Sequence, residues 1–291
     1  MHPTRVLPDR QPEVSRSAGM RFQGDVRIGH SATPRHGHEP EGSIARPSAP
    51  RMTQFLGHDF DVASPSVWLD RVLSDHTGGF AYLATPNVDH VVRASRDAAV
   101  RAAYEAADWK ICDSRVLQRL ARLKRLELAA YPGSDLVFDL LHDPRAAGRR
   151  IAVLGPDVAA MALLRSRFPT LDLVHIDAPM MQAGSPSWDG TLARTEALTF
   201  DILLLCISFP KQEFFAQALK ERGQLAGGIG LCVGASLDFL TGRQRRAPRG
   251  FRKLGLEWLF RLLSQPRRLW RRYLIQGPRI FVLFAIKEMF H

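Results

Sequence analysis

The stretch Asp201-Ile-Leu-Leu-Leu-Cys-Ile207, followed at once by Ser208-Phe-Pro-Lys-Gln-Glu213, decides the fold class. Its apolar run is short and does not alternate with polar residues, which is typical of a strand buried on both faces of a parallel sheet. The polar block after it predicts a turn into a helix over 212–221. Open α/β sheets bind ligands at the carboxyl edge of their strands, so this block is also a candidate binding site.

The same strand and helix unit recurs along the chain from Met52. Short apolar runs predict further strands at 80–84, 109–112, 126–131, 151–154, 171–176 and 229–233. Helical patterns lie between them, at 64–76, 97–107, 115–123, 158–168 and 191–198. This alternation predicts an α/β fold with a Rossmann-like, mostly parallel sheet and helices on both faces.

Charge is distributed unevenly along the 291 residues. The net charge is +11, and 243–291 alone contain 13 Lys or Arg against Glu257 and Glu288. Aromatic and aliphatic residues alternate with these cations, which predicts a basic amphipathic appendage at a membrane surface. The longest apolar run there, Ile280 to Ile286, is too short to span a bilayer. We therefore expect a peripheral protein that lies on a membrane rather than crossing it.

The composition divides the chain into three parts. Residues 1–51 are rich in proline and arginine and have no apolar signal segment, so we expect a disordered leader, with Met20 and Met52 as alternative starts. Residues 52–242 form the predicted α/β core, and 243–291 form the appendage. The three cysteines lie singly in apolar runs, which indicates buried free thiols.

Two motifs follow neighbouring predicted strands and carry candidate chemistry. Thr85-Pro-Asn87 ends the first strand, and Asp113 ends the second. A carboxylate at a strand end is partly desolvated, and such a group is suited to accept a proton from an incoming hydroxyl. The alternative is that Asp113 only caps the helix that follows, a role that Ser114 could share.

Further strand ends supply candidates for substrate binding. Backbone N–H groups at the start of the helix after Ile207, together with Lys211, could hold a diphosphate. Side chains there could bind sugar or ribose hydroxyls, although ordinary helix capping explains the same pattern. The complete candidate set for substrate binding is Thr85, Asn87, Gly155, Pro210, Lys211, Gln212, Glu213, Gly234 and Asp238.

The appendage carries three further blocks in a fixed order. They are R-A-P around Arg246, G-L-E-W-L-F-R ending at Arg261, and P-R-R-L-W-R-R-Y ending at Tyr273. Together with the S-F-P-K-Q-E block, this order resembles the WecG/TagA/CpsF family of bacterial glycosyltransferases. The resemblance extends from about Thr53 to Phe290. Asp113-Ser114 replaces the usual Asp-Gly, and Ala130 stands where the family often has arginine; the Asp-Ser-Arg variant is similar to xanthan-type exopolysaccharide β-1,4-glucosyltransferases.

The resemblance implies an inverting hexosyltransferase of exopolysaccharide or cell-surface polysaccharide synthesis, which we expect at the cytoplasmic face of the inner membrane. It implies a UDP-sugar donor and a polyprenyl-diphosphate-linked saccharide as acceptor, such as an undecaprenyl diphosphate. Asp113 matches the family's proposed base, and Thr85 and Asn87 match its T-x-N motif. Arginines of the appendage would bind the acceptor diphosphate or the membrane, and the candidates are Arg246, Arg261, Arg268, Arg271 and Arg272.

The resemblance also implies that no metal is required. Only Asp59-Phe60-Asp61 fits the D-x-D pattern of metal-dependent enzymes, and it lies at the entrance of the core. The sequence leaves a second interpretation open, a non-catalytic UDP-binding protein docked on a membrane assembly complex. The calculated pI of about 10.3 suggests a nucleic-acid binder, but the concentrated, aromatic-rich appendage argues against it. We therefore expect no nucleic acid among the partners.

Overall fold

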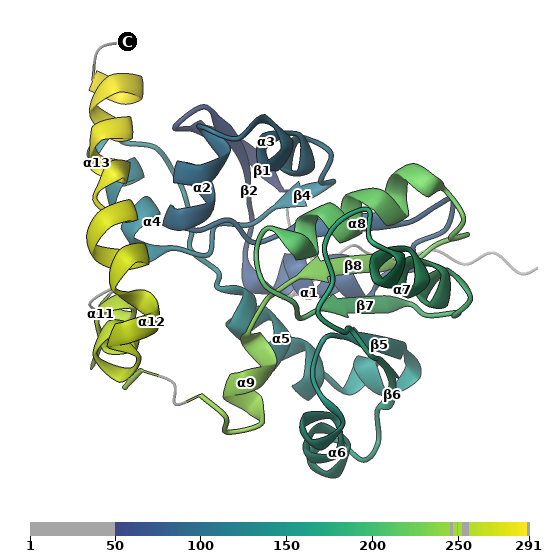
Figure 1. Ribbon diagram of the computed structural model, residues 1–291. Coiled ribbons are helices and arrows are strands. Elements are labelled where there is room, and N and C mark those ends of the chain that lie inside the picture. The colour runs from purple at the N-terminus through teal and green to yellow at the C-terminus, as the bar shows by residue number, and fades with distance from the viewer. Residues whose placement is uncertain (1–49, 245–246, 249, 252–255, 290–291) are drawn as a thin grey trace, which may run out of the picture. The chain divides into compact units, whose positions relative to one another are not determined.

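A six-stranded, entirely parallel sheet forms the centre of the core. The structure is a computed structural model and describes residues 50–289 except 245–246, 249 and 252–255. The strand order is β4-β3-β8-β7-β5-β6. The bounds are β3 Ala81–Ala84, β4 Trp109–Lys110, β5 Arg150–Leu154, β6 Asp172–Ile176, β7 Ile202–Leu205 and β8 Ile229–Cys232. The predicted fold class, including the helical C-terminal part, is confirmed (Figure 1).

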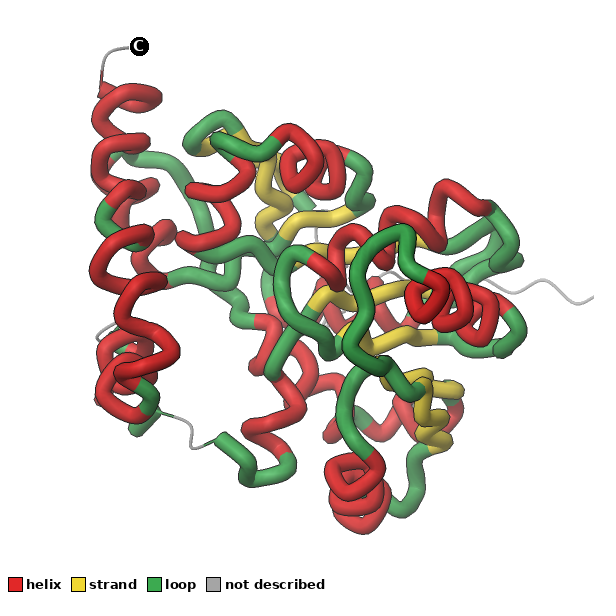
Figure 2. The backbone as a smooth tube through the Cα atoms, in the orientation of Figure 1, coloured by secondary structure: helices red, strands yellow, loops and turns green. Residues whose placement is uncertain are grey.

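Helices cover both faces of this sheet, as Figure 2 shows in red around the yellow strands. One face packs on α1 Pro65–Leu73, α5 Gly133–His142, α6 Val158–Arg167 and α9 Ser236–Leu240. The other face packs on α3 Ala98–Glu105, α7 Pro186–Glu196 and α8 Lys211–Arg222. A short 3₁₀ helix, η1 Pro144–Gly148, follows α5. β7 is buried at every position, which explains why its sequence has no alternation.

A separate apolar cluster joins the C-terminal helices to the core. It combines the hairpin of β1 Arg51–Phe55 and β2 His58–Val62 with α2 Val88–Ala94, α4 Arg115–Leu123 and α13 Arg279–Phe284. Ile280 and Phe284 of α13 are buried in it, and the Phe284 ring meets Phe55 edge-on at 6.1 Å between centroids. Glu288 also accepts a 2.7 Å hydrogen bond from the backbone N–H of Leu56. These contacts attach the end of the chain to its first strands.

The remaining C-terminal helices are α11 Glu257–Ser264, α12 Pro266–Trp270, and the π-helical segments η2 Arg271–Gln276 and η3 Ala285–Met289. The helix is wound more widely than an α-helix at the end of η2, just before Pro278, which has no N–H to donate. There the N–H of Gly277 bonds to the carbonyl of Arg272, five residues back. No helix in the described part of the chain is both long and apolar enough to cross a membrane.

The element boundaries differ from expectation at a few places. The predicted strand at 126–131 is wrong, because this segment pairs with no strand in the described part of the chain. The N–H of Leu126 bonds to the carbonyl of Ala121, and that of Tyr131 bonds to the carbonyl of Cys112. Helix α7 begins at Pro186, earlier than predicted, with Ser185 as its N-cap. The β1–β2 hairpin and α2 were not predicted. The expected leader at 1–51 and the candidate Arg246 lie outside the described residues, apart from the last two leader positions.

Truncating Phe284 tests the attachment of the C-terminal helices. We expect Phe284→Ala to weaken the attachment of the C-terminal helices to the core by roughly 2–4 kcal/mol, because a buried aromatic ring is removed from the cluster with Phe55. The measurement is limited proteolysis at 256–289 combined with thermal unfolding. Phe281→Ala is the matched control, since that ring is 56% exposed on the same helix. Equal protease resistance of both variants would contradict the packing described.

Candidate active site

The carboxyl ends of the parallel strands bring the predicted motifs to one edge of the sheet. Thr85 follows β3, Asp113 follows β4, Gly155 follows β5 and Gly234 follows β8. The polar block at 208–213 follows β7 and starts α8. From β5 the chain adds β6 on the side toward one edge of the sheet, and from β7 it adds β8 on the opposite side. The direction in which strands are added therefore reverses between the neighbouring strands β5 and β7. Such a reversal is where open α/β sheets form their ligand crevice.

Asp113 lies at the end of β4 beside the Thr85-Pro-Asn87 loop. Its backbone N–H donates to the carbonyl of Pro86 at 2.9 Å, and its carboxylate accepts a hydrogen bond from the Asn87 side chain. The helix cap is instead Ser114, whose hydroxyl accepts from the N–H of Leu117 at 3.3 Å. The interpretation of Asp113 as the helix cap is therefore wrong, and its carboxylate is available for another role.

The surroundings of Asp113 favour its protonated form. Burial raises the pKa of this carboxyl to about 7, and the nearby Glu257 carboxylate acts in the same direction. The positive charges of Arg261 and Arg272 and the hydrogen bond from Asn87 oppose this rise in pKa. A carboxylate with a pKa near neutrality can accept a proton and release it again at cellular pH.

The positive charge of Arg261 acts on this carboxylate from the C-terminal part of the chain. It lies on α11, and its guanidinium stands over the Phe239 ring, 4.9 Å from the centroid. Its Nε is buried and has no hydrogen-bond partner among the described residues. A buried guanidinium nitrogen without a partner is costly, and an anionic ligand at this position would satisfy it.

The other predicted arginines divide into two groups. Arg272 is partly buried, and its Nε lies 3.3 Å from the carboxylate of Asp89, a buried side chain on α2. Arg268 and Arg271 are exposed, and the guanidinium of Arg271 stands over the Trp270 ring at 5.3 Å. The structure therefore brings Arg261 and Arg272 toward Asp113 and leaves Arg268 and Arg271 facing solvent.

The block at the start of α8 is joined to the next strand end through Gln212. The Gln212 side-chain carbonyl accepts a 2.8 Å hydrogen bond from the N–H of Gly234, and its amide donates to Glu213 at 2.8 Å. Glu213 is fully buried, and burial raises its pKa to about 7. These two side chains are turned inward and hold the loops in place, while Pro210 and Lys211 are partly exposed at the helix start.

Two aromatic residues that the sequence did not reveal connect the Asn87 loop with this block. The Tyr104 hydroxyl donates to Glu213 at 3.3 Å and lies 2.8 Å from Nδ1 of His90. The His90 ring stacks on Phe209 at 3.9 Å, and its Nε2 lies 3.5 Å from the amide nitrogen of Asn87. Burial holds the pKa of His90 well below its usual range, so the ring is neutral. The spacing of His90 three residues after Asn87 becomes informative only once α2 is known, and α2 was not predicted.

The remaining candidates take structural or peripheral positions. The buried Thr85 hydroxyl donates to the carbonyl of Cys232 at 2.8 Å, so it ties β3 to β8 and does not face the edge of the sheet. Gly155 has a φ of +117°, and a Cβ there would lie 2.8 Å from the carbonyl oxygen of Cys206. Only glycine allows β5 and β7 to end this close together. Asp238 is partly exposed and accepts a 3.0 Å hydrogen bond from Gln244.

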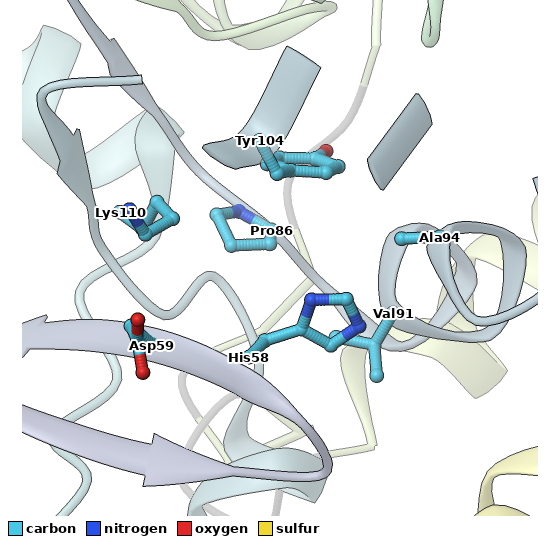
Figure 3. Close-up of a pocket in the computed structure, with 7 residues that line it drawn as sticks. All are labelled: His58, Asp59, Pro86, Val91, Ala94, Tyr104 and Lys110. Atoms are coloured by element: carbon cyan, nitrogen blue, oxygen red, sulfur yellow. The ribbon is translucent and has the colours of Figure 1, made fainter. Parts of the chain in front are cut away.

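A small pocket lies beside the Thr85-Pro-Asn87 loop, between the hairpin and the helices α2 and α3. Figure 3 shows Pro86 between Tyr104 and His58, with Asp59 and Lys110 at the side. Asp61 of the D-x-D pattern accepts a 2.8 Å hydrogen bond from the backbone N–H of Lys110. In the described residues, no three His, Cys, Asp or Glu side chains are grouped as metal ligands. The residues around this pocket pack against the Thr85-Pro-Asn87 loop and support it.

The arrangement combines a carboxyl group with a pKa near 7, a guanidinium whose buried Nε has no partner among the described residues, and the N-terminus of α8. This set suits the transfer of a group that leaves with a negative charge. The model of the glycosyl transferase WecG/TagA/CpsF family matches residues 53–291, which include all of these groups. The protein therefore belongs to the WecG/TagA/CpsF family of glycosyltransferases, whose members act in the synthesis of cell-surface polysaccharides.

Proposed function

We propose that this glycosyltransferase moves a hexose from a UDP-sugar to a polyprenyl-diphosphate-linked saccharide, with inversion at the anomeric carbon. The observation that carries the proposal is the position of Asp113 at a strand end, where its carboxyl pKa is near 7 and the charge of Arg261 acts on it. The family supports glycosyl transfer, and the donor and acceptor classes are those that the resemblance implies.

In this mechanism an acceptor hydroxyl loses its proton to Asp113 as its oxygen attacks the anomeric carbon. The new carbon–oxygen bond forms while the bond from that carbon to the UDP oxygen breaks, and UDP departs with the electron pair. General-base assistance of this kind is typically worth ~10² to 10⁴ in rate. The hydrogen bond from Asn87 would orient the carboxylate for the proton transfer.

The departing UDP acquires negative charge, which needs cations or N–H donors. Lys211 and the first N–H groups of α8 lie at the strand reversal and would hold the donor diphosphate. Gly155 and Gly234 would let the backbone approach the nucleotide closely, and Asp238 would bind a hydroxyl of it. Protein cations would therefore carry the charge without a metal, an expectation that chelation tests directly.

The acceptor side would be formed by Arg261 and Arg272, with the membrane nearby. Several large apolar side chains of the C-terminal helices are exposed: Leu263, Trp270, Leu274, Ile275, Phe281, Val282 and Ile286. Exposed arginines accompany them at 267, 268, 271 and 279. A surface of this composition suits a bilayer interface with anionic headgroups, and we place it at the cytoplasmic face of the inner membrane.

Release of UDP by the purified full-length protein tests the proposal. The protein, in detergent, is given each candidate UDP-sugar together with a sugar-diphospho-polyprenol, with and without EDTA. We expect turnover that depends on the acceptor and survives EDTA. Binding of UDP with no turnover on any pair would instead favour a non-catalytic nucleotide-binding protein, and loss of turnover on chelation would reject the metal-free mechanism.

A further inference from the structure

A groove outside the candidate active site lies between the end of α2 and the start of α13. Figure 1 shows these two helices next to each other, and residues of both line a cavity of about 130 Å³. The lining residues are Val92, Arg93, Arg96, Asp97, Gln276 and Arg279. Water occupies about 30 Å³ per molecule, so the cavity has room for a small polyatomic group. None of the strand-end motifs lines it.

The groove is cationic because its arginines outnumber the acidic groups near it. Arg93, Arg96 and Arg279 line the cavity, with Asp97 as the one acidic lining residue. Asp97 is already engaged as the N-cap of α3, since its carboxylate accepts from the N–H groups of Ala99 and Val100. Within the described residues, neither Arg96 nor Arg279 forms an ion pair. Positive charge in the groove is therefore left without a partner.

Arg93, one of the three arginines that line the groove, is held in place by two neighbours. Its guanidinium lies over the Phe209 ring at 5.3 Å, and its Nε is 3.7 Å from the Asp89 carboxylate. Asp89 is shared with Arg272, so one carboxylate faces two guanidinium groups. Arg93 thus keeps much of its positive charge for a ligand, and the ring and the carboxylate limit its motion.

Guanidinium groups bind phosphate oxygens with paired hydrogen bonds, and several of them on one cavity favour a phosphate over a carboxylate or chloride. Exposed apolar residues, including Ile275, Phe281 and Val282, lie on the same helical segments as Gln276 and Arg279. We propose that this groove is a second phosphate-binding site, in which Arg93, Arg96 and Arg279 hold one phosphate group. The phosphate could be free or carried by a lipid headgroup, and the chemistry of the site is the same.

Binding of inorganic phosphate by the full-length protein tests the site without using enzymatic activity. The titration is done at constant ionic strength in the Lys211→Gln/Arg261→Gln background, which removes a cation from each of the two diphosphate positions proposed for the candidate active site. We expect saturable binding that falls about tenfold or more in Arg96→Gln/Arg279→Gln. The control Arg150→Gln/Arg165→Gln removes the same charge from β5 and α6 and is expected to change binding less than twofold.

Vesicles distinguish the two sources of phosphate. Co-sedimentation with vesicles containing phosphatidylglycerol and phosphatidylcholine is compared with vesicles of phosphatidylcholine alone. If the ligand is a lipid headgroup, Arg96→Gln/Arg279→Gln should bind the mixed vesicles about tenfold more weakly than the unaltered protein does, and the control Arg150→Gln/Arg165→Gln should not. Loss of phosphate binding in solution with equal vesicle binding would identify free phosphate as the ligand. Either result supports the site.

A charge-preserving variant separates a binding site from general surface attraction. Arg96→Lys/Arg279→Lys keeps the positive charge but loses the planar fork of donors. A built phosphate site predicts that this variant loses binding along with the glutamine variant, at unchanged thermal stability. Full binding by the lysine variant, equal loss in the control, or no loss in the glutamine variant in either assay would overturn the proposal.

Discussion

Replacing Asp113 with asparagine is expected to reduce sugar transfer by about 10² to 10⁴ while leaving UDP binding nearly unchanged. The amide keeps the size of the side chain but cannot accept the proton of the acceptor hydroxyl. In the unaltered protein, kcat/KM should rise with pH through about 7, because only the ionised form of Asp113 accepts a proton. Initial rates and UDP titrations across pH 5.5 to 9 measure both effects.

Asp177 provides the matched control for this substitution. It follows β6 at the same edge of the sheet and is exposed, so Asp177→Asn should retain nearly full activity. If Asp113→Asn keeps most of its turnover, or if its rate follows the same pH profile as the unaltered protein, then Asp113 is not the base.

The same substitution should stabilise the fold above neutral pH. Asp113 has a pKa raised from 3.8 to about 7, so its ionisation between these values is less favourable in the folded protein than in the unfolded chain. The contribution of this group to stability therefore falls as pH rises from about 4 to 7. Asp113→Asn removes that loss, and we expect a gain of up to about 4 kcal/mol at pH 8 and little change near pH 4. Thermal unfolding at the two pH values measures it.

Replacing Arg261 with glutamine is expected to lower kcat/KM by roughly 10² to 10³, because a largely buried charged contact to the acceptor diphosphate is lost. Its buried Nε has no partner among the described residues and lies in the surroundings of Asp113. The positive charge also lowers the pKa of Asp113, so the variant's pH profile should move to higher pH. The loss in rate should therefore be larger at pH 7 than at pH 9.

Two further variants separate the effect of the Arg261 charge from that of its guanidinium geometry and from a general loss of charge. Arg261→Lys keeps the charge and should restore the pH profile more than the rate, because the guanidinium fork is lost. Arg267→Gln, an exposed position on α12, is the charge-matched control. An unchanged pH profile in Arg261→Gln would show that this arginine does not act on the ionisation of Asp113.

Much of the fold could be predicted because buried parallel strands have a strong local signal. The run at β7 is apolar at every position. Ser64 followed by Pro65 predicts the start of α1, because the first is a favoured N-cap and the second a favoured first helical residue. The segment at 126–131 is apolar for another reason: Leu128 is buried against the hairpin cluster, without pairing to a strand. Burial alone does not distinguish these two cases in a sequence.

The candidate site could be predicted only where chain position implies spatial position. Parallel strands place their ends at one edge, so the sequence alone was enough to group Asp113 with Asn87. The inward turn of Thr85 and Glu213 depends on which neighbour offers the better hydrogen bond, here Cys232 and Tyr104. His90 contacts Tyr104 and Phe209, residues far from it in the sequence, and no local pattern reports such contacts.

The C-terminal helices can be docked on the β1–β2 hairpin or undocked from it, and the candidate site is complete only in the docked state. Arg261 belongs to the same part of the chain that Phe284 and Glu288 anchor, whereas Asp113 belongs to the core. By thermodynamic reciprocity, any ligand that contacts both must tighten this anchoring by the same factor by which anchoring tightens the ligand. Affinity for an acceptor can thus evolve at the distant hairpin, through residues that never touch a sugar.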